Sequence, residues 1–260
     1  MLLDLTGKTA VITGGSKGIG LATAHRLAAE GCNVCLVARS QKPLEAVAAD
    51  IREIHQVAVT TVAVDLACEE SIVQIQKVCC SPDILVNNAG EIPPGTIEDL
   101  DSMAWRRAWE SKVFGYINLT TAYFPAFKAK RSGVVVNVLG IAGDLLDGNL
   151  IAVSTGNAAL AAFTKALGAW APQFGLRVLG VNPGPVSTDR MIDIQKKKAK
   201  AKLGDETKWQ EAISNFAFGR AASPEEIANA IAFLASPISA YTSGAILAID
   251  GGASAGGSIP

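Results

Sequence analysis

Three glycines occur at a spacing that suits the binding of a phosphate group. Gly14, Gly18 and Gly20 lie in TAVITGGSKGIG, after an apolar run and before a helical pattern. Such a loop needs glycine because its backbone must turn tightly and approach a pyrophosphate, whose charge lies at the N-terminus of the next helix. Glycine triplets also occur in ordinary turns, but the position between a strand and a helix favours a dinucleotide site here.

Two cations accompany the glycine loop. A dinucleotide-binding fold often presents an acidic residue at the end of its second strand, where it holds the adenosine ribose. Here the corresponding run, NVCLVA, is followed by Arg39 and Ser40, and Lys17 lies within the loop itself. Two cations suit a 2′-phosphate, so the sequence predicts NADP(H) rather than NAD(H). The alternative is that Lys17 and Arg39 are ordinary solvated surface charges.

Seven apolar runs alternate with six helical patterns along the chain. The runs are continuous in Val, Ile and Leu, as is typical of strands that are covered on both faces of a parallel sheet. This order predicts one α/β domain over residues 1–260, a doubly wound Rossmann-type fold with a seven-stranded, mainly parallel sheet and helices on both faces. The runs lie at 9–14, 33–38, 59–64, 83–88, 134–139, 176–182 and 245–250, and the helical patterns at 18–30, 43–54, 69–79, 102–129, 152–171 and 224–235.

Two segments stand outside this alternation. Residues 188–218 are rich in Lys and precede the last helical pattern, so we expect an insertion over the substrate side of the sheet. The tail at 252–260, GASAGGSIP, is rich in small residues and is expected to be mobile.

Composition and charge narrow the class of partner. A net charge of −1 argues against binding to nucleic acid or to an anionic membrane. No apolar run reaches the length that spans a bilayer, and the N-terminus lacks a signal peptide pattern, so a cytoplasmic location is expected. The CxxC spacing of Cys32 and Cys35 falls in a strand-like run, and the chain has only two histidines, so no metal site is predicted.

Several motifs together resemble the short-chain dehydrogenase/reductase family over nearly the whole chain. They are TGGSKGIG at 13–20, Asp65 with Leu66, NNAG at 87–90, NPGPVSTD at 182–189, and the C-terminal stretches RAASPEEIANAIAFLAS and YTSGAILAIDGG. The resemblance implies the fold above, NADP(H) binding, and a homo-oligomer, a tetramer or a dimer, built on the long helices and the last strand.

The resemblance and the loop chemistry together assign sixteen residues to the cofactor. The loop after the sixth strand is expected to hold the carboxamide through its backbone, and Thr188 to contact phosphate. The assigned residues are Gly14, Ser16, Lys17, Gly18, Ile19, Gly20, Arg39, Asp65, Leu66, Asn88, Ala89, Gly90, Pro183, Gly184, Val186 and Thr188.

The catalytic residues usual in this family are not found at the corresponding positions. Members usually carry Asn, Ser, Tyr and Lys, of which the Tyr protonates the carbonyl oxygen and the Lys lowers the pKa of the Tyr and holds the ribose. By resemblance these positions fall on Lys112, Gly140, Val153 and Asn157. Valine cannot donate a proton, and general acid–base catalysis contributes about 10²–10⁴ in rate. An unmodified active site is therefore not expected.

Lys112, Asp144 and Ser154 are the polar residues left near these positions, and we consider them as substitute catalytic residues. Lys112 and Asp144 could form an acid–base couple or an anchor for an anionic substrate. The alternative is a buried ion pair that only fills the old site. Tyr116, one helical turn from Lys112, is either a stand-in or part of the core.

Three classes of function are compatible with these features. The first is an NADP(H)-dependent oxidoreductase with a non-standard active site, which acts on a small-molecule carbonyl or alcohol. The second is a catalytically silent NADP(H)-binding protein, such as a sensor or an assembly partner. The third is a lyase or isomerase on the same fold. The resemblance favours the first, although fold alone does not decide function.

Overall fold

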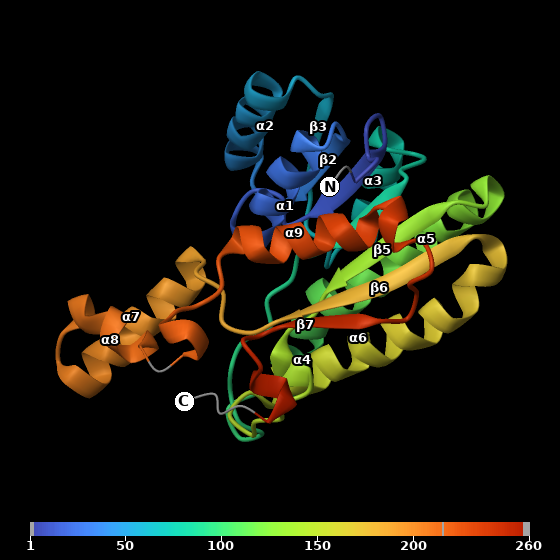
Figure 1. The fold of residues 1–260 in the computed structure, drawn as a ribbon. Helices are drawn as coiled ribbons and strands as arrows, with labels where there is room; N and C mark the ends of the chain where they lie inside the picture. The colour runs from blue at the N-terminus through green and yellow to red at the C-terminus, as the bar shows by residue number, and fades with distance from the viewer. Residues whose placement is uncertain (1–2, 215, 257–260) are drawn as a thin grey trace.

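The structure is a computed structural model that describes residues 3–214 and 216–256. Its sheet has seven strands in the order β3-β2-β1-β4-β5-β6-β7, and every neighbouring pair is parallel (Figure 1). The predicted fold is therefore confirmed, with a sheet that is wholly parallel. The strands are β1 Thr9–Thr13, β2 Asn33–Ala38, β3 Val59–Ala63, β4 Ile84–Asn87, β5 Gly133–Val138, β6 Leu176–Pro183 and β7 Ile246–Ile249.

Helices cover both faces of the sheet, as the alternation of elements requires. One face carries α1 (Gly18–Ala29), α2 (Gln41–His55) and α9 (Pro224–Ala235), whose apolar residues pack in one core cluster. The opposite face carries α3 (Glu70–Val78), α5 (Gly115–Lys130) and α6 (Ile151–Trp170). Short 3-10 turns at 141–143, 171–174 and 237–239 end or join these elements.

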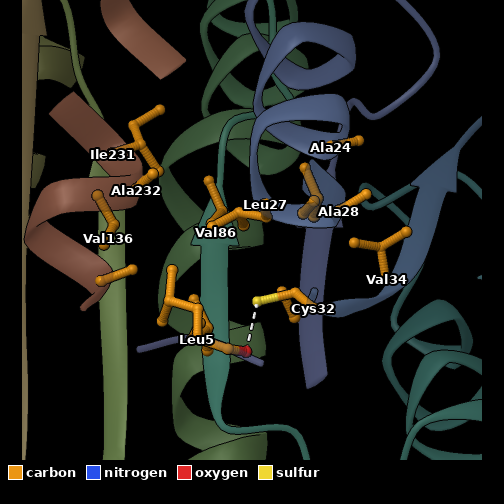
Figure 2. Close-up of a cluster of buried hydrophobic side chains, with 14 of the residues drawn as sticks. Leu5, Ala24, Leu27, Ala28, Cys32, Val34, Val86, Val136, Ile231 and Ala232 are labelled. Carbon is orange, nitrogen blue, oxygen red and sulfur yellow. Dashed lines mark hydrogen bonds between the residues drawn. The ribbon is translucent and has the colours of Figure 1, made fainter. Parts of the chain in front are cut away.

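The core on the α1–α9 face shows how Cys32 packs. Figure 2 shows Cys32 among Leu5, Leu27 and Val34, with its thiol donating to the carbonyl of Leu5 at 3.3 Å. Burial raises the pKa of the Cys32 thiol to about 12, so it stays protonated and packs as a small apolar residue. All five cysteines are free thiols. Within the described ranges, no cluster of three or more His, Cys, Asp or Glu could hold a metal ion.

The helical pattern at 102–129 is not one helix. It divides into α4 (Ser102–Trp109), a π-helical turn, η1 (Glu110–Phe114), and α5. A π turn takes one residue more than an α turn, and such insertions are frequent at functional sites. The hydrophobic pattern of the sequence did not predict this turn. Lys112 lies at the centre of this turn.

The inserted segment folds into helices that lie apart from the sheet. It contains α7 (Asp189–Leu203), η4 (Glu206–Lys208), α8 (Trp209–Ile213) and η5 (Ala217–Gly219), and α7 and α8 project away from the sheet (Figure 1). In the tail, Ala253–Ala255 form a 3-10 turn, and residues 257–260 of the predicted mobile tail lie outside the described residues. None of the helices in the described ranges has the length and hydropathy of a membrane span.

Candidate cofactor cradle and active site

The glycine loop follows β1, at the place where the order of strands reverses. β1 lies between β2 and β4, so successive crossovers run outward from it in both directions. In doubly wound folds ligands bind outside the carboxyl ends of the strands at this switch point. The loops at 14–18, 87–90 and 183–188 all leave the carboxyl ends of strands at this edge.

The loop and the first turn of α1, residues 14–20, form what we call the glycine cradle. Gly14 has φ +68° and donates its N–H to the carbonyl of Val37 at 2.7 Å. A Cβ on Gly20 would lie 2.2 Å from the carbonyl oxygen of Gly14, so only glycine fits there. No side chain caps the N-terminus of α1, which leaves its first N–H groups able to bind an anion.

Thr13 joins the cradle to the loop after β4. Its hydroxyl oxygen accepts from the backbone N–H groups of Asn88 and Ala89 at 2.8 and 2.9 Å, and its carbonyl accepts from the Asn88 amide at 2.9 Å. On the other side, a Cβ on Gly18 would lie 3.1 Å from Cγ2 of Thr188. Residues predicted from three distant motifs therefore lie side by side.

The remaining predicted cofactor residues shape the same edge. Asp65 is exposed and its carboxylate accepts from Ala67 N–H at 3.0 Å, which fixes the turn after β3.

Gly184, in the loop after β6, donates its N–H to the carbonyl of Ile249 at 3.0 Å, and a Cβ on it would lie 3.0 Å from Cα of Asp250. Leu66 and Val186 are buried, and Ile19 packs against the core beside α1.

Lys17, within the glycine cradle, and Arg39, which follows β2, are both exposed. Across the described residues, neither has a carboxylate partner. A groove of about 750 Å³ opens beside Lys17. It is lined by Ser16, Lys17, Gly18 and Thr188 and continues along the outer face of α1 to His25. The cations are therefore free to meet an anionic ligand.

The second part of the site surrounds the end of β5 and consists of Lys112, Gly140, Asp144, Val153 and Asn157; we call it the β5 site. Asn182 links two of its members, because its oxygen accepts from Gly140 N–H at 3.0 Å and its amide donates to Asp144. Sequence reasoning missed Asn182 as an individual residue. Its position as the first residue of NPGPVSTD is the signal that could have found it.

The predicted Lys112–Asp144 couple is not formed between these two described residues. The Lys112 ammonium instead donates to the carbonyl of Leu139 at 3.0 Å, and the Asp144 carboxylate is held by Asn182. The physical reason is that each group already has another partner. Asn182, on the neighbouring strand β6, donates to the Asp144 carboxylate, and Lys112 donates to the carbonyl of Leu139, which follows β5. Burial, and secondarily the nearby Arg190 charge, lowers the pKa of Lys112 to about 8.

Helix α6 supplies the other side of the β5 site. Val153 belongs to an apolar cluster with Ile92, Trp105 and Trp109. Asn157 is 3% exposed, and its Oδ1 has no hydrogen-bond partner among the described residues. Its Nδ2 lies 3.1 Å from the position that a Cβ on Gly140 would take. Lys112 and Asn157 therefore flank the turn at 139–140, and each has hydrogen-bonding capacity that the contacts above do not fill.

Two other candidates are occupied by structural contacts. The Ser154 hydroxyl is buried and accepts from Asp147 N–H at 3.4 Å, so it holds the loop that precedes α6. The Tyr116 hydroxyl is fully buried and donates to the carbonyl of Val138 at 3.0 Å. Burial raises the pKa of Tyr116 well above its usual range, and this residue belongs to the core.

A wholly parallel, doubly wound sheet with a glycine cradle at its switch point defines the class of dinucleotide-binding α/β proteins. Within that class, the family model of the short chain dehydrogenases matches residues 8–199, and the chain belongs to this family.

Relatives with known names cover almost the whole chain. It is 30% identical over 256 residues to the 3-oxoacyl-[acyl-carrier-protein] reductase FabG of Aquifex aeolicus (strain VF5), which spans 97% of this chain and 99% of the relative. It is 33% identical over 250 residues to the cis-4-hydroxycyclohexanecarboxylate dehydrogenase of Sinomonas cyclohexanicum, covering 94% and 96% of the two chains. L-Sorbose reductase from Gluconobacter frateurii, solved with NADPH and L-sorbose, superposes with a TM-score of 0.91 at 33% identity, over 96% of this chain and 98% of that one.

Proposed function

We propose that the protein is an NADP(H)-dependent oxidoreductase that moves a hydride between the cofactor and a small carbonyl or alcohol substrate at the β5 site. The observation that carries this proposal is the glycine cradle at the N-terminus of α1, where Gly20 packs directly on the Gly14 carbonyl and where Lys17 is exposed, as is Arg39 after the neighbouring strand β2. The reductases and the dehydrogenase among its relatives support the reaction class.

The residues of this chain divide the work between the two parts of the site. The N-terminus of α1 and the backbone of the cradle bind the pyrophosphate, and Lys17 and Arg39 bind the 2′-phosphate. The cofactor supplies the hydride when it is bound. Lys112 holds a proton at Nζ beside the end of β5, and Asn182 orients Gly140 and Asp144. We therefore assign the proton-holding role to Lys112 and a positioning role to Asn182.

A second candidate function is a binding protein without turnover. The observation that favours it is the packing of Val153 with Trp105 and Trp109, which fills the position where the family usually carries its proton donor with apolar side chains. Hydride transfer to a carbonyl then develops alkoxide charge with little stabilisation from this side of the site.

The cofactor half of the proposal is tested at Arg39. Arg39→Ala should weaken NADPH binding about tenfold or more, the loss expected for one charge-assisted contact to phosphate. NADH, which lacks that phosphate, should bind the variant and the unmodified protein alike. Calorimetric titration with both cofactors measures the difference, and tighter binding of NADH than of NADPH by the unmodified protein would refute the assignment.

The catalytic half is tested by NADPH oxidation against a panel of aldehydes, ketones and sugars. Slow turnover that Lys112→Ala abolishes supports an oxidoreductase that uses Lys112. Tight NADPH binding without turnover of any substrate supports the binding protein. Lys165→Ala, an exposed lysine on α6, is the matched control and should leave both measurements unchanged.

A further inference from the structure

Two polar groups beside the end of β5 have fewer hydrogen-bond partners than their chemistry provides for. The Oδ1 of Asn157 has no partner among residues 3–214 and 216–256, although the residue is only 3% exposed. The Lys112 ammonium has three N–H donors, and the contact found for it is the carbonyl of Leu139. Buried polar groups in folded proteins are nearly always paired, so the oxygen of Asn157 calls for a physical explanation.

The two groups approach the same backbone turn from different helices. Lys112 comes from the π turn η1 and reaches Leu139, whereas Asn157 comes from α6 and lies against Gly140. Lys112 also packs closely on the loop after β4, since a Cβ on Gly90 would lie 2.5 Å from the Cβ of Lys112. A donor and an acceptor thus flank one short stretch at the carboxyl ends of β4 and β5.

The position of this stretch on the sheet indicates which part of a dinucleotide it faces. The cations Lys17 and Arg39 lie with β1 and β2, on one side of the switch point, and β4 and β5 lie on the other. A dinucleotide binds across the switch point, so its second nucleoside lies over β4 and β5. The ribose of that nucleoside carries hydroxyl groups, and a hydroxyl both accepts and donates a hydrogen bond.

We propose that Lys112 and Asn157 act as a pair that binds the ribose hydroxyls on the nicotinamide side of the cofactor, the ammonium as donor and the carboxamide oxygen as acceptor. This inference rests on the proposed binding of NADP(H). By resemblance the family carries asparagine at position 112 and lysine at position 157, so the two residue types have exchanged helices in this chain. The cation now comes from η1, and α6 supplies the neutral group.

The test compares NADPH with adenosine 2′,5′-bisphosphate, which carries the phosphate-rich adenosine half and lacks the nicotinamide ribose. Lys112→Met and Asn157→Ala should each weaken NADPH binding about fivefold to tenfold, the effect of one hydrogen bond. Both variants should bind the bisphosphate as tightly as the unmodified protein. Quenching of tryptophan fluorescence or calorimetry measures all the dissociation constants.

The double variant Lys112→Asn with Asn157→Lys sharpens the test. If the two residues act as a pair, exchanging both should recover part of the NADPH affinity that either single exchange loses, which is a non-additive result. Lys165→Met is the matched control, and melting curves without ligand identify any variant that fails to fold. If Lys112→Met fails to fold, Lys112→Arg replaces it, because arginine keeps the positive charge and a long aliphatic chain. Lys112→Arg should retain more NADPH affinity than Lys112→Asn.

Three outcomes would overturn the inference. They are unchanged NADPH affinity in folded single variants, equal losses for NADPH and for the bisphosphate, and additive losses in the double variant. Failure of the proposed function looks different, because the unmodified protein would then bind neither NADPH nor the bisphosphate.

Discussion

The glycine cradle and the β5 site lie on the same edge of the sheet and differ in how they are built. The cradle spans seven consecutive residues, 14–20, and its chemistry comes from backbone N–H groups and from the absence of side chains. The β5 site gathers side chains from η1, α6 and the loop after β5, which are far apart in the sequence.

This difference has a consequence for substitution. A side chain added at Gly20, in the cradle, meets the backbone of Gly14, which cannot move without shifting β1 and α1. A change in the β5 site meets side chains, one of which, Val153, packs in an apolar cluster with no hydrogen bond to preserve. We therefore expect the cofactor end to be intolerant of substitution and the β5 end to accept exchanges of chemistry.

The largest expected effect comes from rebuilding the β5 end. The variant with Lys112→Asn, Gly140→Ser, Val153→Tyr and Asn157→Lys should raise carbonyl reduction by about 10²–10⁴ if the pocket is open, since that is the contribution of general acid–base catalysis. Single changes should do little, because such groups act as a unit. NADPH oxidation over a panel of carbonyls measures this. Brisk turnover by the unmodified protein would show that the proton donor lies elsewhere.

A smaller effect is expected when a methyl group is added at Gly20. Gly20→Ala should destabilise the fold by about 1–3 kcal/mol, as overpacking against fixed atoms does, because its Cβ would lie 2.2 Å from the Gly14 carbonyl oxygen and 2.6 Å from the Asn88 amide. NADPH binding should be lost with it. Gly148→Ala is the matched control, since nothing lies within 4 Å of a Cβ there. Urea unfolding of both variants decides the point, and equal stabilities would contradict the geometry.

The smallest effect concerns the proton on Lys112. Its pKa in the folded protein is about 8, against an ordinary value of 10.5. Between these two values the unfolded chain binds the proton more strongly than the folded one, so Lys112 contributes a rise in stability as the pH rises through this window. Below pH 8 both states are protonated and the contribution is constant.

Lys112→Met removes this titration. The free energy of unfolding of the variant should therefore change less between pH 8 and 10.5 than that of the unmodified protein. Urea unfolding at the two ends of the window measures the slopes, with Lys165→Met as the control for an exposed lysine. Parallel slopes for Lys112→Met and the unmodified protein would show that the lysine is not perturbed by burial.

Much of the fold could be predicted from the sequence because its signals are local. The seven apolar runs correspond to the seven strands, and the helical pattern at 224–235 corresponds to α9, which starts with a capping box at Ser223 and Glu226. The sequence did not indicate the π turn at 110–114.

The sequence by itself determined the cradle. Gly14, Gly18 and Gly20 take their roles from backbone conformation and from contacts within one strand–turn–helix unit, so their spacing is sufficient to predict them. Only the tertiary structure decided which hydrogen bonds form in the β5 site. Lys112 donates to the carbonyl of Leu139 and Asp144 accepts from Asn182, whereas the Oδ1 of Asn157 has no partner in the part of the chain that the structure describes. These contacts depend on how strands β5 and β6 pack against η1 and α6. Distances of a few ångströms between such segments cannot be predicted from the local sequence of each one.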